Sequence, residues 1–280
     1  MNPMSLPSSR MLAFVAAMGL IVSPTARAAA SPLAISPQER NWEVQVGQQE
    51  YMTYAQRGEI VPHQSQLYAV LDSVANAVAS VADHQYYTPF RFILLYESEP
   101  NAFSMPGGDV YVTTAMLSYL RNRDELAGVL CHEVNHDIHH DMYNVYEIAQ
   151  RGPQPIAYER AAETEADRAG AYTCAKAGFN PWGMVWNMRL HRGTEQGQQM
   201  ASNADHPGDD QRLTALIALL TGDRGTFGKF KDDVAASVPL LNARAFAQSP
   251  TQYRQEDPQQ PPPQMGPYPP PPLPACYPGC

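Results

Sequence analysis

The stretch Glu125-Leu126-Ala127-Gly128-Val129-Leu130-Cys131-His132-Glu133-Val134-Asn135-His136 contains two histidines four residues apart, with a glutamate between them. On a helix, residues four apart lie on the same face one turn apart, so both imidazoles can reach one small cation. The carboxylate between them projects near the cation without having to bind it. This spacing is typical of a Zn²⁺ site in which the glutamate acts as a base on a water molecule.

The flanking residues indicate that this helix belongs to the core. An exposed polar helix turn would not need the apolar stripe formed by Leu126, Val129, Leu130 and Val134. Polar groups on a buried helix need partners, and a metal ion is one such partner. The pattern therefore predicts one zinc ion per chain, with His132 and His136 as ligands and Glu133 as the catalytic base.

A second helix, predicted over residues 156–177, offers a third ligand. It contains the cluster Glu163-Thr164-Glu165-Ala166-Asp167, and a zinc peptidase needs a third protein ligand while the fourth position stays open to water. Glu163 and Asp167 share a helix face. One of them can bind the metal while the other hydrogen-bonds the second ring nitrogen of a ligand histidine. The residues alone leave both assignments open.

A small sheet is predicted before the motif helix. Residues 90–96 are rich in aromatic and aliphatic side chains and predict one strand, and residues 109–112 predict another after the turn Pro106-Gly107-Gly108. Proline and glycine beside a strand suit the edge of a sheet, and an edge can bind an extended peptide. An ordinary hairpin is the alternative reading.

Helical periodicity and end signals predict the remaining elements. Asn122 and Glu125 form a capping signal at the start of the motif helix. His139 and His140 follow at its end and would extend the metal site if they faced it. Residues 142–155 carry no clear assignment beyond a flap over the site. Further helices are predicted at 37–56, 64–82, 113–120, 181–191 and 211–220.

The two ends differ in composition from the middle. Residues 1–30 resemble a secretory signal, with Arg10 before an apolar run over 11–22 and small residues at Ala26-Arg27-Ala28. Residues 249–280 are dominated by Pro, Gln, Tyr and Gly, which cannot form a packed core. The expected organisation is a signal peptide over 1–30, one domain over 31–248 and a disordered tail.

Charge and cysteine usage narrow the class of protein. The formal charge of −9 and the lack of a basic cluster argue against nucleic acid as a partner. No stretch after residue 30 predicts a transmembrane helix. In an exported protein, Cys131 and Cys174 would form either a disulfide or two buried thiols, and the sequence leaves both open. Cys276 and Cys280 would close a small loop at the end of the tail.

Taken together, these residues resemble the HtpX, CaaX-prenyl-endopeptidase and BepA family of zinc metallopeptidases, which are gluzincins. The similarity covers about residues 40–222 and consists of four motifs in the family's order. They are residues 101–108, residues 124–136, Glu163 to Asp167 with the following 177–181, and His206-Pro207 with Arg212. The resemblance implies an α+β, mainly helical zincin-type domain with a small sheet whose edge strand borders the active-site cleft.

The resemblance also implies roles for individual residues. His132, His136 and Glu163 would bind zinc, Glu133 would be the general base, and Asp167 would orient a ligand histidine. His206 would approach the metal or the oxyanion, Arg212 would support that loop, and His140 would lie just outside the ligands. The substrate backbone would bind at Gly107, Gly108, Asp109, Val110, Tyr111 and Val112. Asn135 and Asp205 depart from the residues usual in the family at those positions.

The function expected from the resemblance is hydrolysis of unfolded or misfolded envelope proteins in the periplasm of Gram-negative bacteria. Secretion is the alternative location, and peripheral association with the outer membrane is a further expectation. The alternative function is a zinc-stabilised chaperone or assembly factor with little or no proteolysis. Either function has polypeptides as partners.

Overall fold

The computed structural model of the protein describes residues 35–152, 156–193 and 209–240. The predicted signal segment, the Pro-rich tail with Cys276 and Cys280, and His206 lie outside these residues. None of the described helices is both long and apolar enough to cross a bilayer. The fold is mainly helical with one small sheet, so the predicted α+β class is confirmed.

The elements follow one another along the chain in this order. They are α1 (Pro37–Arg57), α2 (Gln66–Ala82), β1 (Arg91–Leu95), β2 (Ala102–Met105), β3 (Asp109–Thr113), α3 (Thr114–Tyr119), α4 (Arg123–Ile138), α5 (Asp141–Gln150), α6 (Ile156–Lys176), α7 (Trp182–Gly193), α9 (Asp209–Gly222) and α10 (Arg224–Phe227), with short 3-10 helices at Asp83–Gln85 and Val234–Ala236.

The sheet has the strand order β1-β3-β2. β3 is the central strand, because it pairs in parallel with β1 and antiparallel with β2. All five of its residues are buried. The prediction that residues 109–112 form an exposed edge is therefore wrong. Pro106 and the two glycines form the turn between β2 and β3, and the edge strand nearest α4 is β2.

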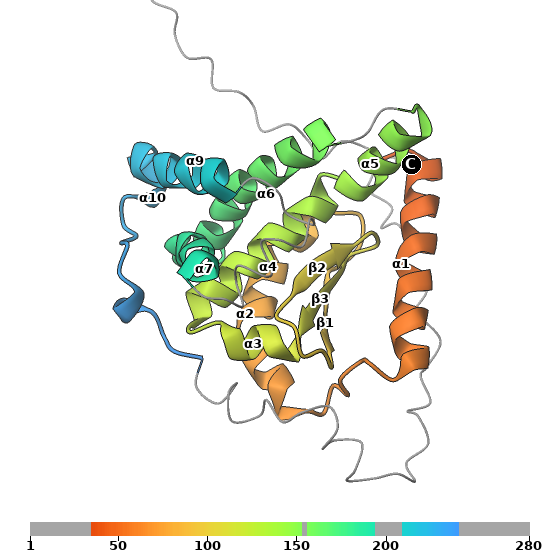
Figure 1. Ribbon diagram of the computed structural model, residues 1–280, viewed down its shortest axis with the longest axis horizontal. Coiled ribbons are helices and arrows are strands. Elements are labelled where there is room, and N and C mark those ends of the chain that lie inside the picture. The colour runs from red at the N-terminus through yellow and green to blue at the C-terminus, as the bar shows by residue number, and fades with distance from the viewer. Residues whose placement is uncertain (1–34, 153–155, 194–208, 241–280) are drawn as a thin grey trace, which may run out of the picture. The chain divides into compact units, whose positions relative to one another are not determined.

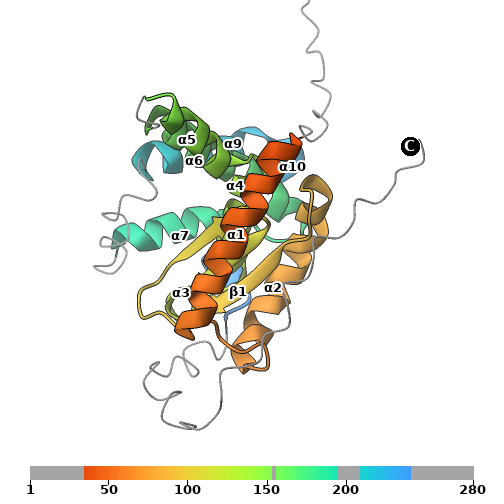
Figure 2. The ribbon, with the colours of Figure 1, turned by 90° about the vertical axis from the view of Figure 1, so that its right-hand side faces the viewer.

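The two faces of the sheet pack against different helices. One face joins the largest apolar cluster, to which α2, α3 and α4 contribute. The other face presents Ile93, Leu95 and Tyr111 to Tyr51 and Tyr54 of α1. Figure 1 shows the result as layers, with the sheet between α1 and α4, and with α6 and α7 on the far side of α4. In the second view α1 crosses in front of the sheet (Figure 2).

Local signals set the helix ends. Ser36 caps α1 and forms a capping box with Glu39, and the Asn122 side chain accepts a hydrogen bond from the Glu125 amide at the start of α4. Both predicted starts are confirmed. α4 ends at Ile138, and the chain turns through His140 into α5, a helix in a segment left unassigned from the sequence.

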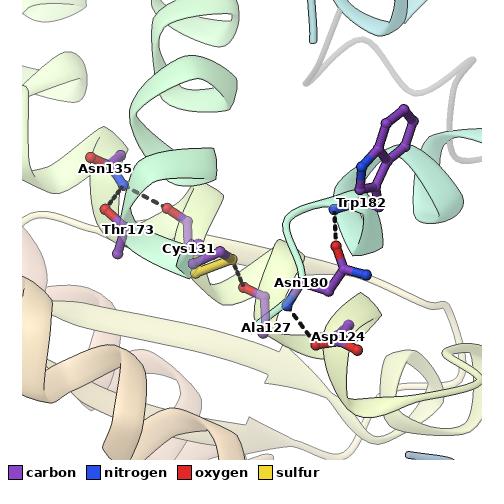
Figure 3. The surroundings of a disulfide bond; sticks show 8 residues. Asp124, Ala127, Cys131, Asn135, Thr173, Asn180 and Trp182 are labelled. Atoms are coloured by element: carbon purple, nitrogen blue, oxygen red, sulfur yellow. Dashed lines mark hydrogen bonds between the residues drawn. A yellow bond between two sulfur atoms is a disulfide. The ribbon is translucent and has the colours of Figure 1, made fainter. Parts of the chain in front are cut away.

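The packing of α4 against α6 is unusually close. A Cβ on Gly170 of α6 would lie 3.1 Å from the Cys131 carbonyl oxygen of α4. The Asn135 amide donates to that same oxygen over 2.7 Å and to Thr173 Oγ1 over 3.1 Å. A disulfide joins Cys131 to Cys174, whose Cα atoms are 5.8 Å apart (Figure 3). The structure therefore contains the disulfide rather than two thiols, and Asn135 connects the two helices.

The disulfide should contribute measurably to stability. It spans 43 residues, and closing a loop of that length in the unfolded chain is worth about 4 kcal/mol in the chain-entropy model. We expect reductant to lower the free energy of unfolding of the protein by about 2–4 kcal/mol, measured by urea denaturation with a chelator present. The matched control is Cys131→Ala/Cys174→Ala, whose stability should not respond to reductant. An equal response of both proteins would contradict the prediction.

Candidate metal centre

Three predicted ligands converge at the interface of α4 and α6. His132 and His136 lie one turn apart on α4, and their Nε2 atoms are 3.0 Å from each other. Glu163 of α6 places Oε2 3.4 Å from His132 Nε2 and Oε1 3.5 Å from His136 Nε2. The three residues form one group of potential metal ligands. The geometric arrangement predicted from the sequence is thus present.

A carboxylate holds the other nitrogen of each imidazole. Asp167 Oδ1 lies 3.0 Å from His132 Nδ1, and Asp141 Oδ2 lies 2.8 Å from His136 Nδ1. The Tyr158 hydroxyl donates to the second oxygen of Asp141 over 2.7 Å. When each Nδ1 donates its proton to a carboxylate, the Nε2 lone pair of each ring faces the other ring and Glu163.

Arg212 of α9 holds Glu163 and Asp167 of α6 in place. Its Nε and Nη2 atoms donate to the two oxygens of Asp167 over 2.7 and 2.9 Å, and its Nη1 atom lies 2.8 Å from Glu163 Oε2. All three side chains are buried. Such bidentate contacts fix geometry as well as charge. Within the described residues, Arg212 therefore supports the carboxylates directly, while its predicted support of the His206 loop stays a prediction.

The donor set fits a zinc ion. Tetrahedral zinc with bonds of about 2.0–2.1 Å separates its ligand atoms by about 3.3 Å, close to the 3.0, 3.4 and 3.5 Å found here. Among the described residues, the buried carboxylates of Glu133, Asp141, Glu163 and Asp167 belong to the site, together with the buried guanidinium of Arg212. A divalent cation offsets most of this excess of negative charge, which is costly to bury without a partner.

Glu133 is placed as the sequence predicts for a base. It is buried on α4 beside the ligands, and its Oε2 atom accepts a hydrogen bond from the Ser104 amide of β2 over 3.1 Å. The contact fixes one carboxylate oxygen and leaves the other for a second partner. Glu133 therefore lies where α4 meets the edge strand.

Four of the six predicted substrate-binding residues, Asp109 to Val112, lie in the central strand β3. Val110, Tyr111 and Val112 are fully buried in the central strand. The Asp109 carboxylate is held by Arg91 through two hydrogen bonds of 2.6 and 2.5 Å. Burial raises the pKa of Asp109, and Arg91 partly offsets the shift. The strand that reaches the base is β2.

His140 bonds a carboxylate of α1. Its Nδ1 atom lies 2.8 Å from Glu43 Oε1 of α1, and the ligand group around His132 does not include it. The neighbouring Asp141 holds His136 instead. Sequence reasoning missed Asp141, because its side chain reaches His136 only through the turn at His140, which no sequence signal predicted.

Fold and site together define a zincin-type metallopeptidase domain of the gluzincin kind: two histidines on one helix, a glutamate on a second, and a carboxylate base beside them. The comparisons agree with this class. Residues 63–159 match the model of peptidase family M48. This region is therefore similar to peptidase family M48. The match includes both histidines and Glu133 and ends before Glu163.

Curated relatives share this region. The chain is 28% identical over 165 residues to the beta-barrel assembly-enhancing protease of Yersinia pestis, covering 45% of this chain and 34% of that protein. It is 28% identical over 131 residues to the protein of the same name in Escherichia coli K12, covering 35% and 27%. It is 24% identical over 159 residues to mitochondrial metalloendopeptidase OMA1 of Schizosaccharomyces pombe, covering 44% of each. The chain thus spans about a third or less of the length of the first two relatives.

The metal-free site should hold a proton on His132. Burial by itself lowers the pKa of this imidazole, but hydrogen bonds and charge from Asp167 and Glu163 outweigh burial and raise the pKa to about 10. Because a raised pKa keeps the ring protonated below that value, we expect its NMR signals in chelator-treated protein to titrate near pH 10 instead of 6.5. The variant Asp167→Asn should lower the midpoint. A midpoint near 6.5 in the parent protein would contradict this.

Proposed function

We propose that this protein is a zinc-dependent metalloendopeptidase that hydrolyses peptide bonds of polypeptides. The observation that carries the proposal is the position of Glu133, a buried carboxylate between the ligand histidines whose second oxygen is not engaged by Ser104. His132, His136 and Glu163 would hold one zinc ion per chain. When bound, zinc supplies a Lewis acid that polarises the scissile carbonyl and makes a water molecule more acidic.

The protein's own groups would move the proton. Ser104 holds Glu133 Oε2, so Oε1 is the oxygen that takes the proton from the attacking water. The same carboxylate then delivers the proton to the leaving amine. Asp141, Asp167 and Arg212 keep the ligands oriented while charge develops. His206 stays the predicted oxyanion donor, a role worth about 3–4 kcal/mol in comparable sites.

We further propose that the substrate binds as an extended strand along β2. The Thr113 amide donates to the Asn101 carbonyl over 2.9 Å, and hydrogen-bonded pairs alternate along an antiparallel ladder. The backbone groups of Ala102 and Ser104 therefore point away from β3. The bond from the Ser104 amide to Glu133 supports this direction. A peptide paired with the Ala102 backbone and the Ser104 carbonyl, the groups that Glu133 leaves open, would run past the base, and an unfolded chain readily adopts that extended conformation.

The proposed setting is the periplasm, with unfolded or misfolded envelope proteins as substrates and peripheral association with the outer membrane. Three observations support it: the signal-like composition of residues 1–30, the disulfide, which persists in oxidising compartments, and relatives named as beta-barrel assembly-enhancing proteases. Because that name also refers to assembly, the competing function is an assembly factor that binds polypeptides and does not cut them.

The variant Glu133→Gln separates these two functions. We expect it to bind one zinc ion per chain, because Glu133 is not a ligand, and to cut an unfolded protein such as casein at least a hundredfold more slowly, because the base is lost. Metal analysis and gel-based proteolysis with and without chelator measure both quantities. A parent protein that binds zinc but leaves casein uncut would favour the assembly factor. A variant that cuts at the parent rate would remove Glu133 from the mechanism.

Backbone methylation of a substrate tests the strand-addition proposal. In a peptide that the protein cuts, each backbone amide is N-methylated in turn. Because alternate amides of a paired strand face its neighbour, cleavage should fall at least tenfold at every second position and change little at the positions between. Mass spectrometry of the products measures the rates. A profile without this two-residue period would mean that β2 does not pair with the substrate.

A further inference from the structure

α1 contains a deeply buried carboxylate. Glu43 is 1% exposed on a helix whose only other buried residue is Gly47. Its Oε1 atom lies 2.8 Å from His140 Nδ1, and its Oε2 atom accepts a hydrogen bond from the Tyr86 hydroxyl over 2.9 Å. Burying a carboxylate is costly. The burial of Glu43 with two specific hydrogen-bond partners therefore indicates a structural or functional role for this side chain. The matched family region begins at residue 63 and does not include α1.

His140 adopts a backbone conformation that is unfavourable for its residue type. Its φ of 55° and ψ of 37° are left-handed, and it is the only described residue other than glycine with a positive φ. Glycine or asparagine usually occupies this place after a helix, because the left-handed backbone conformation is less favourable for residues with a larger side chain. The bond to Glu43 and ring contacts with Tyr86 and Tyr87 hold the histidine there.

The conformation of His140 decides where Asp141 points. Because α4 ends before His140 and the chain turns there, Asp141 begins α5 with its carboxylate beside His136 of α4. Its Oδ2 atom then lies 2.8 Å from His136 Nδ1. Continuing α4 by one more turn would place Asp141 five residues from His136 along the helix, off its face. Glu43 therefore fixes the turn that orients a metal ligand.

The second oxygen of Glu43 supports the other side of the site. The Tyr86 hydroxyl that donates to Glu43 accepts from the Gly107 amide over 3.1 Å. Gly47 lies so close to the same turn that an added Cβ would be 2.0 Å from the Pro106 carbonyl oxygen. This turn ends β2, the strand whose Ser104 amide holds the base. One carboxylate on α1 thus connects the turn after α4 with the turn after β2.

A second cation site is the alternative explanation of this cluster. Glu39, Glu43 and His140 offer ligand atoms within 4.8 Å of one another. However, both oxygens of Glu43 already have protein partners. Glu39 accepts the Ser36 amide in the capping box. A cation would have to displace these bonds, so the contacts favour a hydrogen-bonded clamp.

We propose that Glu43 is a positioning residue for the metal centre, acting through His140 and Asp141 on His136. The proposal rests on the proposed zinc site but not on peptide hydrolysis. It extends the functional unit to a helix that precedes the matched family region. It also assigns a purpose to the unfavourable backbone at His140.

Zinc affinity tests the proposal directly. We expect Glu43→Ala to bind zinc 10–100-fold more weakly in competition with a chromogenic chelator, the range seen when the partner of a ligand is removed. Glu43→Gln should lose less, because its amide oxygen can still accept from His140. The matched control is Glu39→Gln, which removes the neighbouring carboxylate and keeps a capping-box residue. It should bind zinc like the parent protein.

A double-mutant cycle separates positioning from general stability. If Glu43 acts through Asp141, then Glu43→Ala should weaken zinc binding by no more than about twofold in an Asp141→Asn background, whereas independent effects would multiply. Urea unfolding of the chelated proteins reports stability separately. If Glu43→Ala does not fold, the same cycle is run with Glu43→Gln.

The possible outcomes distinguish the proposed function from the positioning role of Glu43. A parent protein that binds no zinc would refute the proposed function itself. A parent protein that binds zinc tightly, with Glu43 variants that match it, would overturn the positioning role alone. Equal losses in Glu39→Gln and Glu43→Gln would indicate a second cation site, and multiplicative losses in the cycle would indicate a purely structural role. Both of these results would also overturn the proposal.

Discussion

The close contact between α4 and α6 is the constraint on which the site depends. The two histidines come from one helix and the third ligand from the other, so the donor atoms meet only if the helix axes approach closely. Gly170 permits that approach, the Asn135 amide bridges it, and the disulfide makes it covalent. Asn135 departs from the family pattern at its position. Its amide adds a hydrogen bond between the same two helices.

Electrostatics explains why so many polar groups tolerate burial here. Each carboxylate around the centre has a defined partner: Asp167 contacts His132 and Arg212, and Asp141 contacts His136. Burial raises the pKa of Asp167, but hydrogen bonds and charge from Arg212 and His132 outweigh burial, so this pKa lies below its usual value. In a region of low dielectric, a network with every member satisfied is stabilising, whereas one missing partner is costly. The arrangement therefore orients the groups that would bind a metal ion.

The parts of the fold that could be predicted from the sequence are those with local signals. Caps and apolar periodicity located most helices, and the spacing within α4 and α6 identified the residues that converge. The edge strand could not be identified in this way, because β2 has only four residues and its position depends on pairing with β3. Contacts across long distances in sequence also escaped prediction: Glu43 and His140 are separated by 97 residues, and no local pattern connects them.

The bridge between Cys131 and Cys174 has a topological consequence. It closes a ring of chain that contains both ligand histidines, the base, Asp141, Glu163 and Asp167. If a peptide bond between α5 and α6 were cut, by the protein itself or by another enzyme, the two fragments would stay joined by the sulfur atoms. The protein could thus be nicked within this ring and still keep all these side chains in one covalent molecule.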